Sequence, residues 1–121
     1  MSSKNSSPDK YVGFLVERFG ELGKATAKSM FGGFGFYCDG LFFAIYDRQH
    51  VYLKADSVTI PEFEARGLPA FRPFPDKPET MKYFRAPAEM LEDDDALRHW
   101  AGAAIHVARR AAAKKTKRTS A

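Results

Sequence analysis

The sequence predicts an α+β fold, in which helices pack on an antiparallel sheet in the order helix, three or four strands, helix, two strands, helix. Three observations carry this prediction. Residues 30–54 are the one long segment without a helical period, and they contain two strong turn sequences. The segments at 8–22 and 94–108 have apolar residues at helical spacing. Five of the 7 prolines lie within residues 69–87, which excludes a helix or a central strand there.

A first helix is expected from Pro8 to about Leu22. Ser7 supplies an N-cap oxygen, and proline is tolerated at the first helical position. Glycines at 20 and 23 end the helix. Residues 1–7 are polar and rich in serine, which predicts a disordered N-terminus. The apolar stripe of this helix consists of Tyr11, Phe14, Leu15, Phe19 and Leu22.

The central segment predicts an antiparallel meander. Residues 25–30 alternate weakly and are expected to form a short first strand. The next strand covers 35–38, and Asp39-Gly40 forms a two-residue turn, because both central residues of such a turn need positive φ. Residues 41–46 form the return strand. A second turn at 47–49 leads into a strand at 50–55.

The remaining elements follow from capping residues and prolines. Asp56 or Ser57 caps a second helix that points Phe63 toward the core and ends at Arg66-Gly67. Residues 70–74 and 80–85 predict a peripheral hairpin, with an irregular proline-rich loop as the alternative. The last helix begins at 92–95 and gives way to a basic flexible tail over 111–121. Its apolar stripe consists of Leu97, Trp100, Ala101, Ala104, Ile105 and Ala108.

Composition limits the class of protein. A chain of 121 residues with 45% hydrophobic residues and 11 Phe is expected to form one domain with an aromatic core, here residues 8–110. No apolar run reaches the length of about 18 residues that predicts a membrane span, so no membrane contact is expected. The N-terminus lacks the apolar segment of a signal peptide. A single cysteine makes no intrachain disulfide, so we expect a cytoplasmic protein.

The positive charge is concentrated at the C-terminus. Residues 109–121 hold six of the 19 Lys and Arg and no Asp or Glu, which leaves 13 cations against 15 anions and a net charge of −2 in residues 1–108. The basic tail is therefore the candidate contact for a polyanion such as nucleic acid, with a weak, salt-dependent interaction. The alternative is a tail that only improves solubility. The candidate residues are Lys114, Lys115, Lys117 and Arg118.

No set of residues in the sequence predicts catalysis, a cofactor or a metal site. The glycines at 32, 33 and 35 precede a strand, whereas a phosphate-binding loop opens onto a helix N-terminus. They are expected to allow close approach of another element. Asp93, Asp94 and Asp95 are interpreted as a helix cap. Cys38 precedes the acidic Asp39, which raises rather than lowers a thiol pKa, and is expected to be a small buried residue.

A surface is the remaining candidate. Residues 41–46 are apolar on both strand faces: Phe43 and Ile45 are expected to point one way, and Phe42, Ala44 and Tyr46 the other. Either helices cover both sides, or one aromatic face contacts a protein partner or a second copy of the chain. Cations near these aromatics extend the candidate. The candidate interaction surface consists of Tyr37, Phe42, Tyr46, Tyr52, Lys54, Lys82 and Tyr83.

An ordered series of short motifs resembles the TfoX N-terminal domain family, which is also called TfoX/Sxy-like. The resemblance covers about residues 8–108. Its motifs are Met30-Phe31-Gly32-Gly33, Gly35, Tyr37-Cys38-Asp39-Gly40, Phe43-Ala44, residues 51–56, residues 63–67, Phe71, Met81-Lys82-Tyr83-Phe84, Ala86-Pro87 and Trp100-Ala101.

This resemblance implies a secretion-chaperone-like α+β domain without catalytic residues. Family members with known roles regulate natural competence genes, acting with a cyclic-AMP receptor protein at promoters. The implied function is therefore a non-enzymatic transcription co-regulator that acts through protein contacts. The alternative is a stand-alone dimeric module that binds a protein or peptide and has no role at DNA. The best-known competence regulators carry a second, helical domain after this one, where the present sequence has its basic tail.

Overall fold

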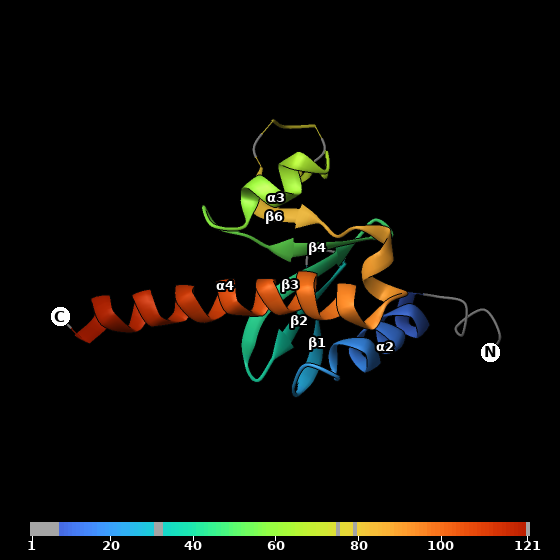
Figure 1. Ribbon diagram of the computed structural model, residues 1–121, viewed down its shortest axis with the longest axis horizontal. Helices are drawn as coiled ribbons and strands as arrows, with labels where there is room; N and C mark the ends of the chain where they lie inside the picture. Colours follow the sequence, from blue (N-terminus) through green and yellow to red (C-terminus); the bar gives the residue numbers. More distant parts are fainter. Residues whose placement is uncertain (1–7, 31–32, 75, 79, 121) are drawn as a thin grey trace.

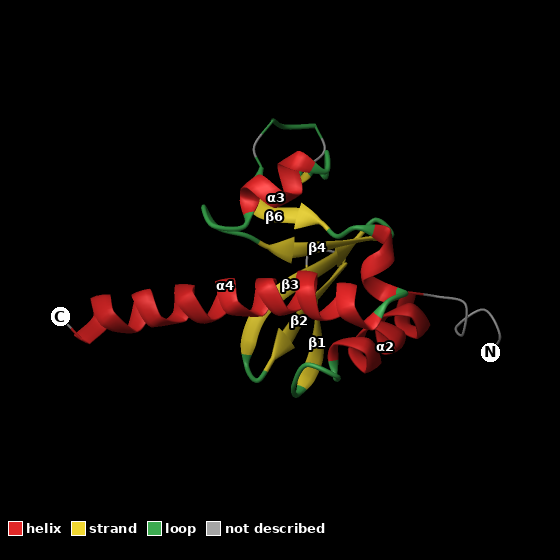
Figure 2. Ribbon diagram, in the orientation of Figure 1, coloured by secondary structure: helices red, strands yellow, loops and turns green. Residues whose placement is uncertain are grey.

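The computed structural model describes residues 8–30, 33–74, 76–78 and 80–120. The N-terminal residues 1–7, predicted to be disordered, lie outside the described residues, as do Phe31, Gly32, Pro75, Glu79 and Ala121. The elements in chain order are α2 (Pro8–Phe19), β1 (Ala25–Met30), β2 (Gly33–Cys38), β3 (Leu41–Asp47), β4 (His50–Lys54), α3 (Ile60–Ala65), β5 (Ala70–Phe71), β6 (Met81–Arg85), the 3₁₀ helix η1 (Ala88–Leu91) and α4 (Asp94–Ser120). The predicted α+β class is confirmed (Figures 1 and 2).

The six strands form one antiparallel sheet in the order β1-β2-β3-β4-β6-β5. The turn at Asp39-Gly40 is confirmed, with φ of 51° and 83° at its two residues. Positive φ at Arg48 (49°) and Gln49 (69°) closes the next hairpin in the same way. These two tight turns make β2, β3 and β4 consecutive neighbours in the sheet.

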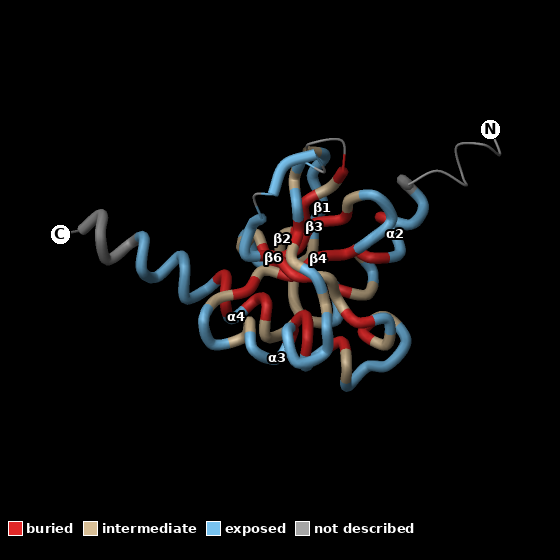
Figure 3. The backbone as a smooth tube through the Cα atoms, turned by 90° about the horizontal axis from the view of Figure 1, so that it is seen from above, coloured by how far each residue is buried: buried red, intermediate tan, exposed pale blue. Residues whose placement is uncertain are grey.

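All described helices pack on one face of this sheet. Figure 1 shows α4 crossing in front of the strands, and Figure 3 shows α3 and α4 on the same side of the sheet. Buried residues of α2, α3, η1 and α4 share one hydrophobic cluster with the strands, which we call the helix-side core. The predicted stripe of the last helix is buried in it. The domain therefore has two layers, helices over a sheet.

Aromatic rings hold the two layers together. Phe19 of α2 contacts Phe36 and Phe43 edge-to-face, with ring centroids 5.4 and 4.9 Å apart. Farther along the sheet, Phe63 of α3 packs on Phe84 and on Trp100 of α4, at 5.3 and 5.2 Å. Each such pair contributes about 0.5–1.5 kcal/mol beyond the area that it buries. Helix packing is thus fixed at both ends of the sheet.

A bulge in β3 corrects the predicted direction of its side chains. Phe36 is paired with Ala44 and the next residue, Tyr37, with Phe42, so Phe43 is an extra residue in the ladder. Phe43 and Ala44 therefore both lie in the helix-side core. The prediction that Phe43 and Ile45 share a face, with Phe42, Ala44 and Tyr46 on the other, is wrong, because strict alternation does not hold across a bulge.

Several predicted boundaries also change. The first helix ends at Phe19 rather than near Leu22. The second helix begins at Ile60 with Thr59 at its N-cap, so the cap expected at Asp56 or Ser57 is wrong; Asp56 accepts instead from the backbone N–H groups of Val58 and Thr59 ahead of the helix.

The predicted hairpin is confirmed, because β5 pairs antiparallel with β6, but its first strand is reduced from 70–74 to Ala70–Phe71. The exclusion of a central strand is wrong, because β6 lies between β4 and β5, within residues 79–86 that contain no proline. The last helix does not end before Ala111, because α4 continues to Ser120. Alanine and lysine are strong helix formers, and residues 111–115 consist of these alone.

We predict that Gly33→Ala destabilises the protein by about 1–3 kcal/mol, as overpacking does elsewhere. A Cβ at Gly33 would lie 2.2 Å from the backbone oxygen of Tyr46, so the β2–β3 ladder must shift. Gly13→Ala is the matched control, since a Cβ there meets nothing within 4 Å. Gly13 lies within α2, so the control should stabilise by about 0.5–1 kcal/mol. Urea unfolding measures both, and equal unfolding free energies for the two variants would contradict the packing at Gly33.

Candidate interaction surface

The face of the sheet opposite the helices is the candidate site, and we call it the open face. Strand register places Tyr37 beside Phe42, Ile45 beside Tyr52, and Lys54 beside Tyr83 on this face. Its buried residues form a second cluster, which contains no residue from a described helix. This cluster consists of Ile45, Tyr52, Phe71 and Tyr83, with Phe42 packed against them.

Aromatic side chains on the open face cover one another. Tyr37 and Phe42 are stacked, with ring centroids 5.1 Å apart, and Phe42 contacts Tyr83 at 5.7 Å. Tyr52 and Phe71 pack at 4.9 Å. As a result, Tyr52 and Tyr83 are only 8% and 4% exposed, although their cluster contains no residue of a described helix. Mutual packing of the rings therefore does much of what a second helical layer would do.

Two cations lie over these rings. The Lys54 ammonium lies 5.2 Å from the centroid of Tyr83 and donates a long hydrogen bond of 3.4 Å to its hydroxyl oxygen. The Arg85 guanidinium lies 5.9 Å from the ring centroid of Tyr52, and its Nε is buried without a hydrogen-bond partner among the described residues. Burial lowers the pKa of Lys54. Burial, aided by the nearby Tyr37, raises the pKa of Tyr83 to about 12.

An apolar hollow of about 550 Å³ opens on the same face. Its walls come from both edges of the sheet, and Ile45 of the central strand β3 lies between them. Phe74 and Met81 remain 59% and 38% exposed, although both are large apolar side chains. The residues that line this apolar hollow are Met30, Gly33, Ile45, Asp47, Arg48, Phe71, Pro73, Phe74 and Met81.

The charged residues of the apolar hollow neutralise each other. Arg48 Nε lies 2.7 Å from a carboxylate oxygen of Asp47, and its Nη2 donates to the backbone oxygen of Arg72 at 2.8 Å. The rest of the lining is apolar apart from backbone groups. Two methionines contribute adaptable side chains, which suit irregular apolar partners. The apolar hollow is therefore suited to apolar side chains rather than to a charged ligand.

Glycine at position 35 lets two residues meet on this face. A Cβ there would lie 2.6 Å from the terminal methyl of Met30 and 2.8 Å from a ring carbon of Phe42. The expectation that these glycines lie in a strand and allow close approach is confirmed at Gly33 and Gly35, which belong to β2. Glycine, whose side chain is a single hydrogen atom, leaves room at position 35 for both Met30 and Phe42.

The predicted surface residues divide among three places. Tyr37, Phe42 and Tyr52 lie on the open face, where Lys54 and Tyr83 join them. Tyr46 does not, since it packs on Tyr11 of α2 at 5.1 Å in the helix-side core. Lys82 lies in a cleft beside α4. Phe71, Phe74 and Met81 also lie at this surface and were not among the predicted residues, although the prolines on both sides of Phe74 indicate a loop there.

A basic cleft of about 230 Å³ joins one end of the open face to α4. It brings together residues from both predicted sets, because Lys114 lies with Lys54, Lys82 and Tyr83. Lys115 is exposed on the same helix, whereas the side chains of Lys117 and Arg118 lie outside the described ones. The residues that line the basic cleft are Lys54, Ala55, Asp56, Lys82, Tyr83, Val107, Arg110, Ala111 and Lys114.

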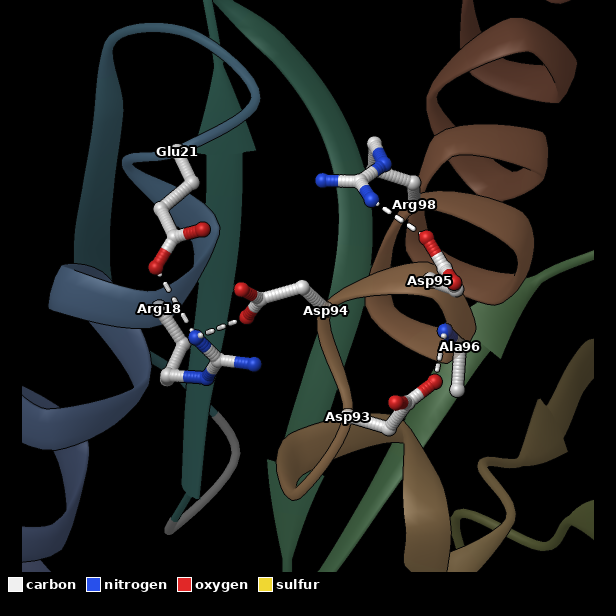
Figure 4. Close-up of polar contacts among 7 residues, drawn as sticks. All are labelled: Arg18, Glu21, Asp93, Asp94, Asp95, Ala96 and Arg98. Atoms are coloured by element: carbon white, nitrogen blue, oxygen red, sulfur yellow. Dashed lines mark hydrogen bonds and ion pairs between the residues drawn. The ribbon is translucent and has the colours of Figure 1, made fainter.

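The acidic run before α4 has a structural role, as predicted. Asp93 accepts a hydrogen bond of 2.9 Å from the backbone N–H of Ala96, and thus caps the helix (Figure 4). Asp94 pairs with Arg18 of α2 at 3.1 Å. Arg18 also holds Glu21, at 2.8 Å. Asp95 pairs with Arg98 one turn later. These contacts tie the start of α4 to α2.

The remaining reactive groups are also engaged. Cys38 is buried, and burial together with the neighbouring Asp39 raises the pKa of its thiol, so the nucleophilic thiolate is disfavoured. His99 Nε2 lies 2.7 Å from a carboxylate oxygen of Glu62 in α3. Across the described residues, no three His, Cys, Asp or Glu side chains converge on a possible metal position. None of the helices in that part of the chain combines the length and apolarity that crossing a bilayer requires.

The chain matches the model of a known protein family. The family model of the TfoX N-terminal domain matches residues 17–108, which include the whole sheet and most of the helix-side core. The match ends within α4, before Arg110 and Lys114. Among curated proteins, the comparison gives no match.

We predict that the last tyrosine to ionise is Tyr83, with a pKa of about 12 against the ordinary 10.0. Its folded pKa is raised, so its contribution to stability is intact below pH 10.0 and is lost as pH rises toward 12, where the unfolded phenol ionises first. Phenolate absorbance measures this titration. Tyr83→Phe should remove the final step, whereas Tyr37→Phe should keep it, because burial is the larger cause. A final step that survives Tyr83→Phe would refute the assignment.

Proposed function

Because the chain belongs to the TfoX N-terminal domain family, we propose that it is a non-enzymatic regulatory module that acts through protein contacts at the apolar hollow. One observation carries the proposal: Phe74 and Met81 leave large apolar surface exposed beside an otherwise apolar hollow. Apolar side chains that lie together at a surface commonly mark a protein contact. The apolar hollow can accept a few side chains, which act as anchors in protein interfaces.

The partner that the proposal favours is a component of the transcription machinery. Competence regulators of this family act with a cyclic-AMP receptor protein at promoters, which is the role implied by the sequence resemblance. A partner segment would place apolar side chains against Ile45 and Phe71 and cover Phe74 and Met81. Since Asp47 and Arg48 already neutralise each other, the anchor itself needs no charge.

A non-enzymatic role is supported by what the reactive groups do. The acidic residues at 93–95 cap α4 and pair with arginines, and Cys38 is a buried thiol of raised pKa. His99 contacts Glu62 at the surface, in a pair that joins α4 to α3. Each of these groups has a structural contact that accounts for it.

The second candidate is a stand-alone dimeric module without a role at DNA. The position of β1 favours it, because β1 is an edge strand of the sheet and contributes Met30 to the apolar hollow. A second copy placed against this edge would cover both the strand and the hollow. Lys28, exposed on β1, would oppose such pairing unless it faced an anion.

We predict that the protein retains RNA polymerase or a cyclic-AMP receptor protein from an extract of its own cells. The double variant Phe74→Ser with Met81→Ser should lose this retention, because it removes the exposed apolar surface of the hollow. Val58→Ser is the matched control, since Val58 is 71% exposed and does not line the hollow. The measurement is a pull-down with quantification of the named proteins.

Two outcomes would count against this proposal. If the wild-type protein retains no transcription component, a role at promoters is refuted. If the double variant and Val58→Ser retain equal amounts, the apolar hollow is not the contact surface. Unfolding curves of the variants exclude loss of the fold as the cause.

Light scattering separates the second candidate from the first. A dimer through the hollow has a mass of twice the 13.6 kDa chain, and the Phe74→Ser, Met81→Ser variant should return to one chain mass. A wild-type protein of single-chain mass at high concentration would exclude the dimeric module. A dimer that survives the double substitution would place the dimer contact elsewhere.

A further inference from the structure

The basic cleft gathers four cations around one carboxylate. Lys54 comes from β4, Lys82 from β6, and Arg110 and Lys114 from successive turns of α4. The carboxylate is that of Asp56, in the segment between β4 and α3. Segments far apart in the sequence therefore meet at one point of strong positive charge, although residues 1–108 carry a net charge of −2.

The carboxylate of Asp56 already makes an ion pair and hydrogen bonds within the protein. Its Oδ2 accepts from Arg110 at 2.8–2.9 Å, and its Oδ1 accepts from the backbone N–H groups of Val58 and Thr59 at 3.1 and 3.3 Å. Burial alone would raise the pKa of Asp56, but the bonds from Arg110 and the backbone hold it below its ordinary value. This carboxylate therefore stays ionised and balances Arg110 alone.

Three cations of the basic cleft remain without an ion pair among the described residues: Lys54, Lys82 and Lys114. The nearest polar contact of Lys54 is the long bond to the Tyr83 hydroxyl, and burial lowers its pKa. An anion placed in the cleft would relieve this uncompensated charge. It would also accept charge-assisted hydrogen bonds from the three ammonium groups.

The positive charge continues along the projecting part of α4. Figure 1 shows this part of α4 extending past the edge of the sheet. The sequence of α4 has no Asp or Glu after Asp95, and it carries six Lys and Arg from Arg109 to Arg118. Residues 110–118 rise about 12 Å along a helix, which spans three or four phosphates of one nucleic-acid strand at about 3.4 Å each. Positively charged residues spread over this length suit a polymeric anion better than a single small one.

We propose that the basic cleft and the projecting part of α4 bind the phosphodiester backbone of duplex DNA. The occupant is a duplex rather than a single strand, because single strands need free aromatic rings for base stacking. Here the rings of Tyr37, Phe42 and Tyr83 pack on one another. Contacts to phosphates alone hold the protein on DNA without reading sequence.

This proposal goes beyond the protein contact at the apolar hollow and does not depend on it. The apolar hollow and the basic cleft share no lining residue. Arg110 and Lys114 lie outside the residues matched by the family model, so the proposal does not follow from family membership. A partner held at the hollow would thus leave the cleft available for DNA.

Fluorescence anisotropy with a labelled duplex of about 20 base pairs, at several salt concentrations, tests the proposal. The variant Lys82→Gln with Lys114→Gln removes two exposed cations of the cleft. We expect it to weaken binding about tenfold at low salt and to lower the slope of log K against log salt by about two. The control is Lys10→Gln with Lys24→Gln, which removes the same charge from exposed positions outside the cleft and should change affinity less than twofold.

The outcomes are decisive in each arm. No wild-type binding to the duplex at low salt overturns the proposal, and so does an equal loss in the two double variants, which would indicate an effect of net charge. Single-stranded DNA of the same length that binds as tightly as the duplex refutes the duplex assignment.

Polyglutamate that displaces the duplex at equal charge concentration would indicate an acidic polypeptide instead. The Phe74→Ser, Met81→Ser variant should bind the duplex normally, which separates this test from that of the protein contact.

Discussion

The bulge at Phe43 is the constraint on which both faces of the sheet depend. It inserts one residue into β3 opposite Phe36 and Tyr37, so that Phe43 and Ala44 both face the helices. Phe43 then lies against the edge of Phe19, and α2 is anchored at that point. On the other side, the same bulge leaves Phe42 and Ile45 on the open face. In a regular strand, Phe42 and Ile45 would lie on opposite faces, because they are three residues apart, and so would Phe43 and Ala44.

On the open face, aromatic residues are buried by one another rather than by a second layer of helices. Rings from β2, β3 and β6 pack in a chain from Tyr37 through Phe42 to Tyr83, and a second pair joins Tyr52 of β4 to Phe71 of β5. This mutual cover ends at the apolar hollow, where Phe74 and Met81 stay exposed. The surface available for a partner is therefore not the aromatic centre of the sheet but its apolar margin. Tyr83 also lines the basic cleft, so the two candidate surfaces flank one aromatic cluster.

Sequence patterns predict the turns and the buried sides of helices, because neighbouring residues determine these features. Asp39-Gly40 predicts its turn because few other pairs tolerate two positive φ values, and the stripe ending at Ala108 predicts the buried side of α4. The bulge has no such signal, because it results from the fit of Phe43 under Phe19. The apolar hollow forms only because Met30 and Phe71, from opposite edges of the sheet, line the same hollow. The basic cleft requires Lys82 to meet Lys114, which only the path of α4 decides.

Side-chain footprinting with hydroxyl radicals tests most directly whether the apolar hollow is the protein-binding surface. In the free protein, Phe74, Met81 and Val58 should be modified, whereas the buried Met90 and Phe43 should not. With RNA polymerase from the same cells present, Phe74 and Met81 should become protected while Val58 remains reactive. Protection of Val58 with continued modification of Phe74 and Met81 would contradict a contact at the hollow.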